Sequence, residues 1–137
     1  MSILDIPDMP IELYYPNCAH TIDDIGFFNV PPLNGSGYIC DWIAACDKRL
    51  AMDVDTIVPG HGPICGKADF AEMRDYRRLV LCEGKKHFDR GMSAGRAALD
   101  IDLGKYATWV DSDRILTNVA RLCTERLQRQ MATVKAC

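Results

Sequence analysis

The sequence predicts a mixed α/β chain, in which a small mixed sheet packs against helices and the C-terminal part is mostly helical. Three observations support this class. Short runs rich in strand-forming residues occur within the first 60 residues. The apolar spacing changes to a helical period at Asp41, and every periodic segment after Asp69 is helical. Because the chain has no internal repeat or linker, residues 1–137 are predicted to form a single domain.

Two strands are expected before the first double proline. Residues 11–15 alternate in polarity and end at a Pro-Asn turn signal. Residues 25–30 form a short apolar run that two prolines stop. The following segment, 31–37, is rich in Asn, Gly, Ser and Pro and is predicted to be a loop.

A helix and a third strand follow. Trp42, Ile43 and Cys46 fall at helical spacing behind Asp41, which is a suitable N-cap, and the helix is predicted to end near Asp53. Residues 56–58 form a β-branched run that predicts a buried strand. The sequence Pro-Gly-His-Gly-Pro breaks this strand, so His61 is placed just beyond its C-terminal end.

Three helices are predicted in the remainder of the chain. Asp69 and Glu72 have capping-box spacing at the start of the longest helix. Ser93 can cap a short helix, and Asp111 or Ser112 can cap the last one. The inward residues of the longest helix are Phe70, Met73, Tyr76, Arg77, Val80, Gly84 and Phe88, and those of the last are Ile115, Val119, Leu122, Cys123 and Leu127.

Composition excludes several classes of protein. The chain is 48% hydrophobic and 26% charged, which is typical of a soluble globular domain. A net charge of −3 lacks the basic excess of nucleic-acid-binding proteins. The acidic start is unlike a signal peptide, and no apolar run approaches the roughly 18–20 residues of a membrane helix. Seven cysteines without a C-x-x-C pair favour a reducing, cytoplasmic location.

Two of the three histidines are candidates for chemistry. His20 and His61 lie in turn-like loops after predicted strands, where α/β folds build their sites. His87 lies in the longest predicted helix beside two lysines, and this basic stretch predicts a surface residue without a role.

The sequences around these two histidines resemble motifs of the metallo-β-lactamase superfamily. The first is Asn17-Cys18-Ala19-His20-Thr21-Ile22-Asp23-Asp24, and the second is Val58-Pro59-Gly60-His61-Gly62-Pro63. The resemblance covers roughly residues 11–130. It implies that His20 and His61 are ligands of zinc or iron and that Asp24 occupies the position of the loop aspartate.

The chain departs from that family in two ways. The H-x-H-x-D-H motif, which supplies most metal ligands in the family, does not occur in the sequence. The bridging aspartate is also missing, because residues 25–38 contain no acidic residue. The resemblance therefore implies a truncated metallo-β-lactamase-like half-fold, equivalent to the C-terminal half of the family's hydrolases with an internal deletion.

Two histidines do not complete a catalytic zinc site, which normally has three protein ligands and an open position. Asp23 or Asp24 could add an oxygen ligand, although each is also a suitable turn or cap residue. Cys18 and Cys65 could join the two histidines in a closed, structural Cys2His2-like site. The alternative for both cysteines is that they are small buried apolar side chains.

Three functions are therefore expected from the sequence. The first is a hydrolase-like protein with an incomplete metal site, inactive or nearly so as a lone monomer, whose missing ligands come from a second copy or a complementing polypeptide. The second is a non-catalytic binding or oligomerisation module. The third is a structural zinc protein. In each case a homo-oligomer or another protein is the expected partner, with no nucleic acid and no membrane.

Overall fold

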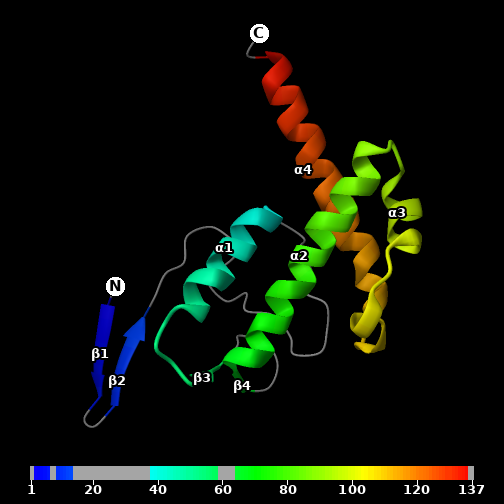
Figure 1. The fold of residues 1–137 in the computed structure, drawn as a ribbon. Coiled ribbons are helices and arrows are strands. Elements are labelled where there is room, and N and C mark those ends of the chain that lie inside the picture. Colours follow the sequence, from blue (N-terminus) through cyan, green and yellow to red (C-terminus); the bar gives the residue numbers. More distant parts are fainter. Residues whose placement is uncertain (1, 7–8, 14–37, 59–63, 136–137) are drawn as a thin grey trace.

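The computed structural model describes residues 2–6, 9–13, 38–58 and 64–135. The elements follow the order β1 (Ser2–Ile6), β2 (Met9–Leu13), α1 (Ile39–Leu50), β3 (Thr56–Ile57), β4 (Cys65–Gly66), α2 (Lys67–Asp89), α3 (Ala94–Asp100), the 3₁₀ turns η1 (Gly104–Thr108) and η2 (Ser112–Arg114), and α4 (Ile115–Lys135). Helix α2 runs through the middle, with α1 on one side and α3 on the other, and α4 starts beside α3 and crosses behind α2 (Figure 1). The helix-rich, mixed α/β class is confirmed.

The described strands form two separate antiparallel pairs. β1 pairs with β2, with Ser2 opposite Leu13, and β3 pairs with β4. The prediction of one mixed sheet is therefore wrong for the described part of the chain. The predicted strand 11–15 overlaps β2, whereas β1 and β4 were not predicted, and the predicted strand 25–30 lies outside the described residues. A two-residue strand such as β4 is too short to produce an alternating pattern.

Helix α2 carries the central face of the core. Its residues Phe70, Met73, Tyr76, Arg77, Val80 and Gly84 are buried, as the helical spacing predicts. The main cluster consists of Ile39, Tyr76, Val80, Ala97, Ile101, Tyr106, Ile115, Val119 and Leu122. Leu127 is 52% exposed, so its prediction as an inward residue is wrong. Glu125 is buried and Arg126 stacks over the ring of Phe88, so α4 is still covered at this level and Leu127 lies on its uncovered side.

The start of α1 is capped by a different helix. The predicted N-cap, Asp41, lies inside the first turn, and the actual N-cap, Tyr38, makes no side-chain capping bond. Instead, the buried carboxylate of Glu125 in α4 accepts the backbone N–H of Ile39 at 3.3 Å with both oxygens. Burial raises the pKa of this carboxyl, while the Ile39 N–H and Arg121 oppose the rise. A carboxylate at this end is favoured by the helix dipole.

Local capping fixes both ends of α2. The helix begins at Lys67, so Asp69 is not its N-cap as predicted; its carboxylate accepts the N–H of Gly66 at 3.0 Å from within the first turn. At the other end, Gly91 has a φ of 74°. The N–H groups of Gly91 and Met92 donate to the carbonyls of Phe88 and His87, which is the Schellman arrangement that ends a helix.

The prediction of Ser93 as a cap is confirmed, and that of Asp111 or Ser112 as the cap of the last helix is wrong. Ser93 caps α3, because its hydroxyl accepts the N–H of Arg96 at 3.4 Å. The turn η2 precedes the last helix. Asp111, the residue before η2, has the left-handed backbone conformation, with a φ of 56°. In place of a side-chain cap, the Asp111 carboxylate accepts a hydrogen bond from Arg114 at 2.7 Å.

An aromatic cluster fixes η1 against α2. The rings of Tyr76, Tyr106 and Trp109 pack in edge-on and stacked pairs with centroids 4.8–5.7 Å apart. Asn118 of α4 donates to the Tyr76 hydroxyl at 3.0 Å. Burial raises the pKa of Tyr76 to about 12, so this phenol stays protonated under ordinary conditions.

In the described part of the chain, none of the helices combines the length and the apolar character that crossing a membrane requires.

Candidate functional site

The structure describes one of the five predicted site residues. Cys65 lies in β4. His20, Asp24 and Cys18 fall within residues 14–37, and His61 falls within residues 59–63; all four lie outside the described residues. The structure therefore describes the frame from which the segment carrying His61 emerges.

That frame is the β3–β4 pair. Ile57 and Cys65 are register partners, as are Thr56 and Gly66. Opposite residues in an antiparallel pair have Cα atoms about 4.5–5.5 Å apart. The segment 58–64 therefore leaves and rejoins the frame at nearly the same place. Its two described flanking residues, Val58 and Ile64, are 72% and 68% exposed.

A small apolar cluster holds this frame against both neighbouring helices. It contains Cys46 of α1, Ile57 of β3, and Phe70 and Met73 of α2, all buried. Leu50, Val54 and Cys65 pack around it and are partly buried. The base of the segment that carries His61 therefore rests on the junction of α1 and α2.

Cys65 is the one predicted site residue whose surroundings the structure describes. Its side chain packs against the apolar cluster, where burial raises the thiol pKa, and the nearby Asp69 carboxylate raises it further. This packing suits the alternative in which Cys65 is a small apolar side chain. Among the described residues, no three His, Cys, Asp or Glu side chains are grouped to hold a metal ion.

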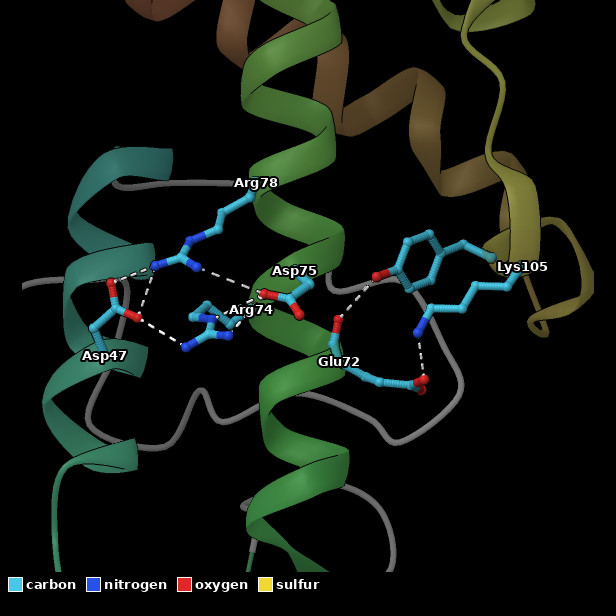
Figure 2. Close-up of polar contacts among 7 residues, drawn as sticks. Asp47, Glu72, Arg74, Asp75, Arg78 and Lys105 are labelled. Atoms are coloured by element: carbon cyan, nitrogen blue, oxygen red, sulfur yellow. Dashed lines mark hydrogen bonds and ion pairs between the residues drawn. The ribbon is translucent and has the colours of Figure 1, made fainter.

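A charged cluster on α2 joins the neighbouring elements from both sides (Figure 2). Asp47 of α1 receives hydrogen bonds from Arg74 at 3.1 Å and from Arg78 at 3.0 Å, and both arginines also lie near Asp75. On the other side, Lys105 pairs with Glu72. Most of these side chains are at least partly exposed, so each pair contributes little to stability. Because each carboxylate is paired with a cation, the cluster orients α1 and η1 rather than offering a reactive group.

A buried cation lies beneath these pairs. The guanidinium of Arg77 stacks over the ring of Trp42 at 4.6 Å, and its Nη1 lies 3.9 Å from the sulfur of Cys46. Burial raises the pKa of the Cys46 thiol, while Arg77 opposes that rise. Arg77 thus links the face of α2 to α1 next to the apolar cluster that supports β3.

The prediction that His87 is a surface residue is wrong. Its side chain is buried, with Nδ1 2.7 Å from the carbonyl oxygen of Glu83 and Nε2 2.8 Å from a carboxylate oxygen of Asp100. Helical spacing could have located it, since His87 follows the inward residues Val80 and Gly84 by seven and three positions. The adjacent lysines, which are themselves exposed, were the misleading signal. No sequence signal marked Asp100 as its partner.

Comparisons with protein-family models, curated proteins and solved structures find no match for this chain.

Proposed function

We infer that the chain is a hydrolase-like domain of the metallo-β-lactamase type, whose metal site is incomplete in one copy and which hydrolyses little or nothing as a lone monomer. His20, His61 and Asp24 are its proposed ligands for zinc or iron. The observation that supports this proposal is the β3–β4 pair. The Pro-Gly-His-Gly sequence connects these two paired strands and follows the buried residue Ile57 closely in the sequence.

The described residues support the idea that the β3–β4 pair positions the segment that carries His61. A ligand loop must return to the same geometry each time it binds, and loops on rigid elements do so best. Ile57 is fixed by the apolar cluster, and Gly66 is fixed by its bond to Asp69 at the start of α2. Both ends of the segment that carries His61 are thus anchored by contacts that do not depend on a metal.

A bound metal ion would act as a Lewis acid that activates water for attack on an ester, thioester, amide or lactone carbonyl. The chain itself supplies two histidines and a carboxylate for this purpose, and the H-x-H-x-D-H segment is absent from it. The missing ligands are proposed to come from a second copy, in which the same residues converge across a symmetric interface, or from a complementing polypeptide. A cytoplasmic location is proposed with this, and the described cysteines are free thiols.

The alternative of a non-catalytic binding module has one specific observation in its favour. Val58 and Ile64 are large apolar side chains that stand exposed together at the ends of the segment that carries His61. Apolar residues at such a position suit contact with another protein.

Zinc affinity measured by isothermal titration calorimetry tests the proposal. His20→Ala and His61→Ala are each expected to weaken zinc binding by at least about tenfold, because each removes a direct ligand. Cys65→Ala is the matched control and is expected to bind zinc as the unchanged chain does. Equal loss in Cys65→Ala would indicate the structural site instead. Zinc binding that no histidine variant alters, or turnover of an ester or lactone by the monomer at typical enzymatic rates, would contradict the proposal.

A further inference from the structure

The buried imidazole of His87 lies between two hydrogen-bond acceptors. Nδ1 faces the backbone carbonyl of Glu83 at 2.7 Å, one turn earlier in α2. Nε2 faces the carboxylate of Asp100, the last residue of α3, at 2.8 Å. The contact with Asp100 joins the C-terminal end of α2 to the C-terminal end of α3.

This geometry matches only the doubly protonated ring. A carbonyl oxygen accepts hydrogen bonds and cannot donate them, and an ionised carboxylate is also an acceptor only. The neutral imidazole has one N–H group, so one of its nitrogens would face an acceptor without a proton between them. The imidazolium donates to both partners and adds a charge-assisted bond to Asp100.

Two of the other charged groups near this contact are paired: Lys86 with Glu83 at 2.7 Å on α2, and Arg126 of α4 with Asp89 at 2.9 Å. Arg90 is the cation that opposes protonation of the ring. From α3, the facing carboxylate is Asp100.

The balance of these groups raises the pKa of His87 above its ordinary value of 6.5. The bond to the Glu83 carbonyl is the largest cause, followed by the bond to Asp100, while burial opposes the rise. A group whose pKa is higher in the folded protein contributes its full stabilisation below its unfolded pKa. That contribution is lost as the pH rises from about 6.5 through the pKa of the folded protein.

We propose that His87 and Asp100 form a pH-sensitive latch, which holds α3 against α2 while the imidazole is protonated and lets α3 open locally more often when it is deprotonated. Helix α3 is suited to local opening, because it has seven residues and follows the tight turn at Gly91. Ala97 of α3 and Ile101, the residue after α3, cover part of the main core. The Asp100 carboxylate is 61% exposed, so it can move into solvent without crossing that core.

Hydrogen exchange of the whole chain, followed by NMR from about pH 6 to about pH 9, tests the latch. The reporters are the amides of Ala97 and Ile101, which donate to Ser93 and Ala97 at 2.9 and 3.0 Å. Their protection factors, corrected for the intrinsic pH dependence of exchange, are expected to fall as the pH rises. Release of one proton limits the fall to about tenfold per pH unit.

Two carboxylate variants separate the latch from a general effect of pH. Asp100→Asn is expected to remove the pH dependence, because its amide can donate to the neutral ring as well as accept from the charged one. Asp89→Asn removes an equal charge from the last turn of α2, and this variant is expected to keep the pH dependence of protection in α3. Constant protection of α3 in the unchanged chain would overturn the proposal. The same fall in Asp100→Asn as in the unchanged chain would also overturn it.

Discussion

Replacing Phe70 with Ala is expected to lower the free energy of unfolding by about 3–5 kcal/mol. Phe70 is 1% exposed and packs with Cys46, Ile57 and Met73, the cluster that supports β3 and β4. The substitution deletes the buried ring with its apolar contacts and leaves a cavity between α1 and α2. Urea denaturation followed by circular dichroism measures the loss.

Two further variants test the reason for this loss. Phe70→Leu keeps most of the apolar volume and is expected to cost less than about 1.5 kcal/mol, which keeps the chain folded for comparison. Leu99→Ala removes an apolar side chain that is 86% exposed and is expected to change stability by less than about 0.5 kcal/mol. If Phe70→Ala cost no more than Leu99→Ala, the packing described for β3 and β4 would be wrong.

Replacing Gly84 with Leu is expected to lower the free energy of unfolding by about 3 kcal/mol. Gly84 lies where α2 and α4 approach closely, and a Cβ atom added there would lie 2.6 Å from Cδ2 of Leu122. Leu122 is itself buried in the main cluster, so it has little room to move aside. The larger side chain must therefore separate the two helices or distort their contact. Thermal and urea unfolding both report the change.

Gly95 provides the matched control for helical glycine. It lies in α3, and nothing within 4 Å would meet a Cβ atom added there. Because Ala is the better helix former by roughly 0.8–1 kcal/mol in a helix interior, Gly95→Ala is expected to be neutral or stabilising. Stabilisation by Gly84→Leu as well would show that propensity alone decides both sites and that α2 and α4 are not in close contact.

Periodicity predicted the helices and most of their buried faces. The inward residues of α2 and the first turns of α4 were predictable because apolar side chains recur every three or four positions. Ser93 was predictable as a cap because the side chain and the backbone group it binds are three residues apart. Both signals are local in sequence.

The features that were missed depend on contacts between distant residues. Glu125 caps α1 across a separation of 86 residues, so the sequence pointed to the nearer Asp41 instead. His87 is satisfied by Asp100 across the turn between α2 and α3, and neighbouring lysines made it look exposed. Leu127 follows Cys123 by four positions, but Cys123 lies at the edge of the buried face of α4, so Leu127 is exposed.

The candidate site was predictable in part. The position of His61 beyond a strand follows from the β-branched run and its Pro-Gly break, and β3 confirms a strand over Thr56–Ile57. The prediction that this strand is buried is wrong except for Ile57, because Thr56 and Val58 are exposed. The pairing of β3 with β4 was not predictable, because β4 consists of Cys65 and Gly66 alone. The roles of His20, His61 and Asp24 remain predictions, since these residues lie outside the described part of the chain.

Native mass spectrometry of the purified chain with zinc tests the proposed shared metal site, because it reads the number of chains and of metal ions in one species. We expect that zinc is retained in an oligomer, that the monomer retains none, and that His61→Ala loses the metal. A monomer that keeps zinc firmly would contradict the claim that one copy holds an incomplete site. A metal-free oligomer that His61→Ala leaves unchanged would contradict the metal site itself.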